Sequence, residues 1–395
     1  MLCWVGWIVN YLNRMNVPPI LPLIMRDFDL NYAQAGLLTT AFLLGYAGMQ
    51  LPSGFLSDRY GRKIMIVFGM VVYSVGTLLM GIASNIHQIT ALRFLVGLGE
   101  GTHLSVANSL ISEYFSGKSR AKAIGIHESG PNVGSTIALP LVVFISVVLG
   151  WRWVFYITAI PGLILAALFW KVVKEPARPR SRDRQTAITS VPMKGMTATL
   201  VSMAVAYSAY NLCIWVLYNF VPTYLVDVRG MSLVAASFIT TLLPASGIFA
   251  KIMSGYVSNR VGRKWVICSG LGVTGLSVCI LTMTEDPMQL MIVMVCMGLA
   301  LFSFSPAIYS FVADVSPPHK RGTFLSLVNV TGLLTGAVSP AVVGFIADQA
   351  GFNTAFLYIS GLSLLSTLPI LLWMRSPRGR IDDARSAQLD LTKEG

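Results

Sequence analysis

Residues 54–63 read GFLSDRYGRK and residues 255–264 read GYVSNRVGRK, so one pattern occurs twice at a displacement of 201 residues. Other matches at the same displacement are Glu113 with Asp314, Arg120 with Arg321, Gly150 with Gly351 and Phe155 with Phe356. Several separate matches at one displacement indicate an internal duplication. The chain is therefore predicted to consist of two related halves.

The composition places both halves in a membrane. Hydrophobic residues make up 54% of the 395 residues and charged residues 12%, whereas soluble chains carry about 25% charged residues. This excludes a soluble enzyme, a disordered chain, a collagen and a nucleic-acid binder. Because a bilayer span needs about 20 apolar residues, the apolar stretches predict twelve spans. They are expected at 2–24, 35–56, 64–83, 89–113, 122–148, 152–172, 196–224, 233–256, 265–284, 288–312, 323–347 and 354–374.

Each half holds six of these spans. We expect an N-terminal bundle over 1–173, a cytoplasmic linker over 174–195, a C-terminal bundle over 196–374 and a cytoplasmic tail over 375–395. The linker contains prolines and arginines and too few apolar residues to bury itself. The predicted fold is an all-α integral membrane protein with twelve transmembrane helices in two pseudo-symmetric six-helix bundles. Such halves are typical of secondary transporters, which bind substrate between them near the midplane.

The net charge of +12 comes from loops on one side of the predicted membrane. Only Arg26, Arg152 and Arg229 fall in the opposite loops. The positive-inside rule places basic loops in the cytoplasm. We therefore expect a multi-pass protein of the plasma or inner membrane with both termini in the cytoplasm. The five cysteines lie in apolar spans without metal-ligand spacing, so we expect no disulfide, metal or cofactor. We also expect a monomer that contacts the lipid bilayer and no nucleic acid.

The loop at 54–63, its weaker copy and the twelve spans together resemble the major facilitator superfamily. The resemblance implies a cytoplasmic conformational latch in which Asp58 faces the start of a helix in the other half. It also implies that the basic residues of the loop pair with acids; these are Arg59, Arg62 and Lys63. A carboxylate near a helix N-terminus gains free energy in only one of two conformations. Asn259 in the second copy lacks this charge.

Ionisable residues inside a bilayer are costly and therefore need a reason. Away from the span ends, five charged residues fall within predicted spans: Arg14, Arg93, Glu100, Glu128 and Lys251. Arg93 and Glu100 lie seven residues apart and so share one helix face. We expect Lys251 to extend its ammonium to the cytoplasmic interface. His103 and His127 could relay protons or simply bond neighbouring helices.

The duplication did not preserve these charges. The positions that correspond to Arg14, Arg93 and Glu100 in the second half are Trp215, Met294 and Leu301. A functional site explains this asymmetry better than fold maintenance, although a buried ion pair between Arg93 and Glu100 is the structural alternative. Two arginines with one acid favour an organic anion, because guanidinium groups match carboxylates. Glu100 is the candidate proton-coupling residue.

Three further segments resemble the anion:cation symporter branch, which includes sugar-acid and other organic-anion permeases. They are NYLNRMN at 10–16, RFLVGLGEG at 93–101 and GWRW at 150–153. The resemblance implies that Arg14 and Arg93 hold the substrate carboxylate, with Tyr11, Tyr46 and Asn13 in the substrate site and Glu100 coupling transport to protons, or to sodium. The family usually has Asp at the position of Asn13, so one of two proton sites is missing.

Other functions stay open on the sequence. GPNVG at 130–134 resembles part of a motif of drug-efflux antiporters. The spacing of Arg and Glu in spans 1 and 4 is similar to that of spinster-like lipid carriers. A receptor or scaffold would bind a ligand without moving it. No nucleophile–base pair, phosphate loop or metal cluster supports an enzyme. Cavity-facing residues beyond the charged ones are expected on two spans: Tyr46 and Gln50, and Tyr207, Tyr210, Asn211, Trp215 and Tyr218.

Overall fold

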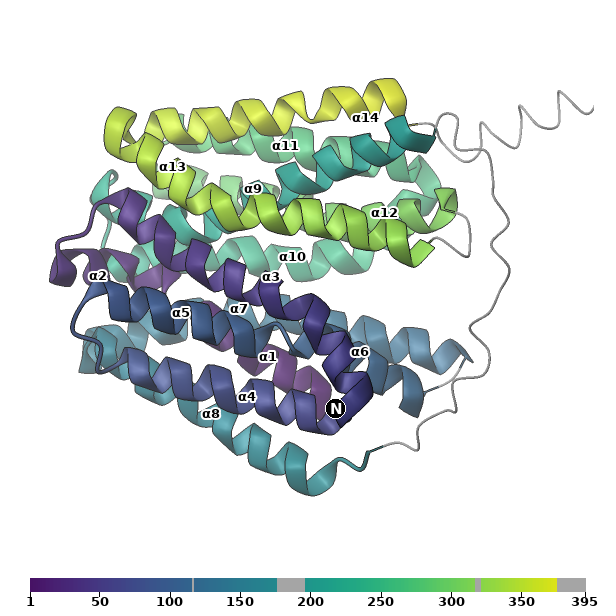
Figure 1. Ribbon diagram of the computed structural model, residues 1–395. Coiled ribbons are helices and arrows are strands. Elements are labelled where there is room, and N and C mark those ends of the chain that lie inside the picture. The colour runs from purple at the N-terminus through teal and green to yellow at the C-terminus, as the bar shows by residue number, and fades with distance from the viewer. Residues whose placement is uncertain (116, 176–195, 317–320, 375–395) are drawn as a thin grey trace, which may run out of the picture.

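A computed structural model describes residues 1–115, 117–175, 196–316 and 321–374, and these residues form helices without a strand. The elements are α1 Leu2–Arg14, η1 Pro18–Ile20, α2 Leu21–Phe28, α3 Tyr32–Tyr60, α4 Arg62–Met80, α5 Ile86–Glu100, α6 His103–Tyr114, α7 Gly117–Leu149, α8 Trp151–Val172, α9 Met196–Asp227, α10 Leu233–Val261, α11 Arg263–Met283, α12 Pro287–Val315, α13 Arg321–Leu365 and α14 Thr367–Trp373. In Figure 1, α9 to α14 lie together above α1 to α8. We call these groups the C half and the N half.

The twelve predicted spans are all present, but three are interrupted. The first is α1, η1 and α2 in series, broken before Pro18, because proline cannot continue a helix that precedes it. The fourth is α5 followed by α6. The twelfth is the last part of α13 followed by α14. α13 also contains the eleventh span, and the two spans meet within it at Gly351, which has φ of 80°. Eight described helices are long and apolar enough to cross a membrane. Most of the expected linker and the whole expected tail lie outside the described residues.

The repeated loops have the same backbone in both halves. Gly61 ends α3 with φ of 108°, and Gly262 ends α10 with φ of 100°, a conformation that favours glycine. The arginine after each glycine forms an ion pair with the acid predicted to be equivalent. These pairs are Arg62 with Glu113 and Arg263 with Asp314. The duplication inferred from the sequence is thus confirmed by geometry. We call the membrane side that carries these loops the basic side.

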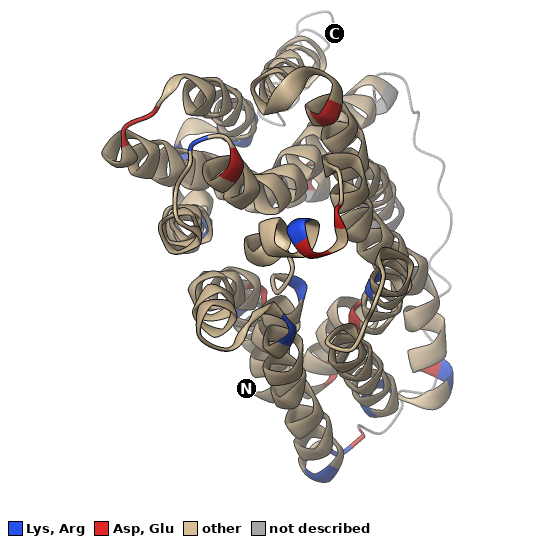
Figure 2. Cartoon of the chain, turned by 90° about the vertical axis from the view of Figure 1, so that its left-hand side faces the viewer, with Lys and Arg blue, Asp and Glu red and all other residues tan. Residues whose placement is uncertain are grey.

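The two halves pack against each other on the opposite side. There α3 and α13 approach so closely that a Cβ on Gly36 would lie 2.3 Å from the Pro340 carbonyl oxygen. A Cβ on Gly344 would lie 2.2 Å from the Tyr32 carbonyl oxygen. Only glycine allows such an approach. Figure 2 looks onto this side, where the two groups of helices meet and both acidic and basic residues lie on the segments that face the viewer.

A carboxylate joins the halves on this side. Asp348 of α13 accepts hydrogen bonds from the backbone N–H groups of Tyr32 and Ala33, both at 2.8 Å, in the first turn of α3. Asp227 at the end of α9 adds a 3.7 Å ion pair with Arg26 of α2. A negative charge at a helix N-terminus is stabilised by the free N–H groups and the helix dipole. These contacts form only while the two halves are closed against each other on this side, the one opposite the basic side.

We therefore expect Asp348→Asn to shift the conformational equilibrium away from this closed state. Losing one charged hydrogen-bond acceptor at an exposed helix end costs about 1 kcal/mol, or roughly fivefold in the ratio of conformations. Spin labels on His87 of the N half and Met288 of the C half would report the separation by pulsed electron resonance. Asp27→Asn is the control, because Asp27 pairs with Arg152 within the N half. An unchanged distance distribution in Asp348→Asn would show that this contact does not hold the halves together.

Candidate functional site

A cavity of about 200 Å³ lies between the halves. Its walls are α1, α3, α6 and α7 in the N half and α9, α10, α12 and α13 in the C half. Gln50, Tyr309 and Asn329, which lie toward the basic-side ends of their helices, line it. The cavity therefore extends from the midplane toward the basic side. Its charged lining residues are Arg14, Glu128 and Lys251.

Arg14 and Glu100 form an ion pair at the wall of this cavity. Nε of Arg14 donates to Oε2 of Glu100 at 2.9 Å, and the two side chains are 2% and 0% exposed. Each residue ends its helix, α1 or α5, at an interruption of a membrane span. Oε1 of Glu100 has no hydrogen-bond partner among the described residues. A buried carboxylate with a single cationic partner is sensitive to anything that competes for that partner.

Aromatic rings surround the Arg14 guanidinium. Its Cζ lies 4.4 Å from the ring centroid of Tyr11 and 4.5 Å from that of Tyr46. The ring of Trp215, on α9 in the C half, lies 5.7 Å away. Such rings stabilise a cation without neutralising it. The guanidinium can consequently still bind a carboxylate that enters the cavity.

Arg93 does not join the ion pair between Arg14 and Glu100. It is 1% exposed, its Cζ lies 4.6 Å from the centroid of Phe42, and it forms no ion pair with Glu100. The structural alternative of an Arg93–Glu100 pair is therefore wrong. Nε and Nη1 of Arg93 have no hydrogen-bond partner in the described part of the chain. Arg93 lines a separate void of about 10 Å³, which also touches Arg14 and Trp215.

Asn13 also points away from the cavity. Its Nδ2 donates to the carbonyl oxygens of Val9, at 3.1 Å, and Thr158, at 3.2 Å, and so ties α1 to α8. Adjacent residues on a helix point about 100° apart, which explains why Arg14 faces the cavity and Asn13 does not. The aromatic and polar stripe expected on α9, together with Tyr46 and Gln50, does line the cavity.

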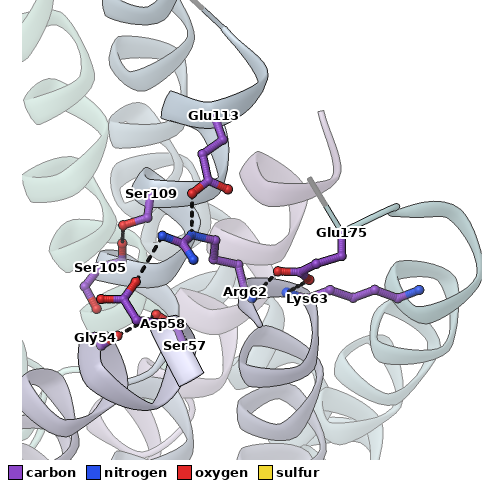
Figure 3. Close-up of polar contacts among 9 residues, drawn as sticks. All are labelled: Gly54, Ser57, Asp58, Arg62, Lys63, Ser105, Ser109, Glu113 and Glu175. Atoms are coloured by element: carbon purple, nitrogen blue, oxygen red, sulfur yellow. Dashed lines mark hydrogen bonds and ion pairs between the residues drawn. The ribbon is translucent and has the colours of Figure 1, made fainter. Parts of the chain in front are cut away.

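The four predicted latch residues lie together on the basic side, as Figure 3 shows in part. Arg62 pairs with Asp58 at 3.0 Å and with Glu113 at 2.7 Å. Glu175 accepts from the backbone N–H groups of Arg62 and Lys63 at 2.6 and 2.9 Å. Arg59 lies over the ring of Tyr60.

These contacts all lie within the N half. Asp58 is 69% exposed, and the residues just before α13, 317–320, are outside the described part. Among the residues that the structure describes, Asp58 pairs with Arg62 of its own half, and the expected contact with the other half falls partly on residues outside the described part. Sequence reasoning missed Glu175 as a partner because it placed residue 175 in the linker.

The cavity belongs to a chain with many known relatives. A family model described as Major Facilitator Superfamily matches residues 3–260 and 203–392. The chain is 29% identical to a hexuronate transporter of Bacillus subtilis, over 94% of this chain and 93% of the relative. It is 27% identical to a D-galactonate transporter of Escherichia coli, over 92% of each. A probable galactarate/D-glucarate transporter of Bacillus subtilis is 26% identical, over 92% of this chain and 88% of the relative.

Among solved structures, the fold is similar to that of a bacterial homolog of the human lysosomal transporter Spinster in an inward-facing, occupied conformation. The TM-score is 0.83 with 21% identity, over 95% of this chain and 96% of the other. At this identity the likeness concerns the fold alone.

Proposed function

From the membership of this chain in the major facilitator superfamily, we propose that it imports an organic anion by proton-coupled alternating access. The anion is a sugar acid or another carboxylate. Membership of the superfamily makes the chain a multi-pass membrane transporter and not an enzyme. The observation that carries this proposal is the Arg14–Glu100 ion pair at the cavity wall. The sugar-acid substrates named for the relatives support it. The basic side is then cytoplasmic, with the chain in the cell membrane as a monomer.

In this proposal the substrate carboxylate competes with Glu100 for the Arg14 guanidinium. Once the carboxylate binds Arg14, Glu100 is left buried without its cation, and burial favours the neutral, protonated form of a carboxyl group. One proton would then bind together with the anion. Both would be released toward the basic side when the ion pair between Arg14 and Glu100 forms again, as it is seen here. Sodium could replace the proton only through an additional oxygen site.

Other residues have supporting roles in this scheme. Tyr11 and Tyr46 lie beside Arg14 in the cavity and would contact the hydroxyl groups of a sugar acid. Arg93 would contribute positive charge from behind Phe42 in this conformation. Asp58 with Arg59, Arg62 and Lys63 would favour the state closed on the basic side. Asp348 favours the state closed on the opposite side.

A ligand screen tests the substrate class. A ligand that binds only the folded protein raises its melting temperature, so purified protein is heated with sugar acids, other carboxylates and lipophilic cations. We expect stabilisation by one or more carboxylates and by no lipophilic cation. Stabilisation by lipophilic cations alone would contradict anion import and would favour drug efflux.

A further inference from the structure

Lys251 is a cation on the C-half wall of the cavity. It lies on α10 and lines the same cavity as Arg14, which lies on α1 of the N half. Its ammonium makes no hydrogen bond or ion pair with any residue that the structure describes, and the ring centroid of Phe302 lies 5.7 Å away. The predicted extension of Lys251 to the membrane interface is therefore not what the structure shows.

The packing of α10 against α7 fixes where this cation lies. Nδ2 of Asn132 on α7 donates to the carbonyl oxygen of Pro244 on α10 at 3.2 Å, and a Cβ on Gly247 would lie 2.5 Å from the same nitrogen. The helices run in opposite directions, so one turn further toward the basic side brings Glu128 on α7 and Lys251 on α10 to the interface. Lys251 consequently belongs to the basic-side part of the cavity, across from the N half.

Charge compensation in the cavity is uneven. Arg14 already has Glu100 at 2.9 Å. Glu128, the acid across from Lys251, accepts a hydrogen bond from Asn108 at 3.2 Å and forms no ion pair with the lysine. In the described part of the cavity lining, Lys251 is thus the cation that forms no ion pair. An ammonium in a partly desolvated site favours an anionic ligand.

We propose that Lys251 is the second anion-binding residue of the cavity and that the preferred substrate carries two anionic ends, as a dicarboxylate does. The inference rests on the proposed function and specifies the substrate class of the same site. A dicarboxylate can pair with Arg14 of the N half and Lys251 of the C half together. A monocarboxylate bound to Arg14 leaves Lys251 without an ion pair. Contact with both halves would also favour the conformation in which they are closed around the ligand.

Galactarate and galactonate are matched probes, because they differ only in one terminal group, a carboxylate in the first and a hydroxymethyl in the second. Their dissociation constants are measured by calorimetry on the purified full chain. We expect wild-type protein to bind galactarate about tenfold more tightly than galactonate, the effect of one charged hydrogen bond. Lys251→Gln should bind galactarate about as weakly as galactonate, with galactonate little changed. Lys251→Arg should restore the preference. trans,trans-Muconate and sorbate form a second such pair without hydroxyl groups.

The results that would contradict this inference differ from those that would contradict the proposed function. Equal binding of both members of each pair by wild-type protein, or equal weakening of both by Lys251→Gln, would overturn the inference while leaving anion transport intact. Glu128→Gln is expected to keep the dianion preference. If it removed the preference in the same way as Lys251→Gln, the two residues would act as an ion pair between the halves rather than as a substrate anchor. Failure of all four probes to bind would overturn the proposed function as well.

Discussion

Arg14→Gln is expected to abolish binding of carboxylated substrates, with dissociation constants raised at least about a hundredfold. Arg14 is a cation of the cavity wall. Its guanidinium already binds one carboxylate, that of Glu100. Charged hydrogen bonds contribute about 1.5 to 3 kcal/mol each, and a bidentate contact with a substrate would use two. Calorimetric titration with the carboxylate found in the ligand screen measures the loss.

Two further variants separate binding from folding. Removing one partner of a buried ion pair costs about 3 to 5 kcal/mol, so Arg14→Gln alone also lowers stability. The double variant Arg14→Gln with Glu100→Gln removes both charges and should recover much of that stability without recovering binding. Arg14→Lys keeps the charge but not the planar fork, and should bind about tenfold more weakly than wild type. Unchanged affinity in the double variant would exclude Arg14 from the substrate site.

Glu100→Gln is expected to keep substrate binding and anion exchange but to lose accumulation driven by a pH gradient. Glutamine has nearly the shape of glutamate and can still accept from Arg14, whereas it cannot take up a proton. With one proton per anion and no membrane potential, one pH unit drives a tenfold gradient in wild type. Glu100→Gln should build up no substrate gradient under the same pH difference. Uptake of labelled substrate into proteoliposomes under an imposed pH difference measures it.

Glu128→Gln is the control for this result. Glu128 is the other acid on the cavity, but its carboxylate is bound by Asn108 and is not paired with an arginine. Protein with this change should still accumulate substrate. If Glu100→Gln accumulated substrate as wild type does, Glu100 would have no part in coupling.

The sequence was sufficient for features that depend on regular spacing. The displacement between residues 54–63 and 255–264 predicted two related halves, and the pairs Arg62–Glu113 and Arg263–Asp314 occupy equivalent places. Membership of the superfamily, with sugar-acid transporters among its relatives, agrees with the resemblance. The stripe on α9 that includes Tyr207 and Trp215 faces the cavity because helical periodicity continues without a break there.

Features that depend on helix interruptions or on contacts between halves could not be predicted in this way. α1 ends at Arg14 and α5 ends at Glu100. A prediction that treats each span as one continuous helix therefore cannot show that Arg14 meets Glu100 while Arg93 stays apart. Asp348 looks like an ordinary polar residue near a loop, and only the tertiary fold places it at the start of α3. The position of Lys251 near the end of its helix predicts an interfacial side chain, and only the tertiary fold places it on the cavity wall.

Proton uptake on substrate binding reports whether the anion and the proton are coupled at the Arg14–Glu100 ion pair. Calorimetric titration of wild-type protein in buffers of different ionisation enthalpy gives the number of protons taken up per anion bound. If the substrate displaces Glu100 from Arg14 and Glu100 is then protonated, uptake should approach one proton in wild type and should be absent in Glu100→Gln. Binding without proton uptake by wild-type protein, or the same uptake by Glu100→Gln, would contradict the coupling of anion and proton at this ion pair.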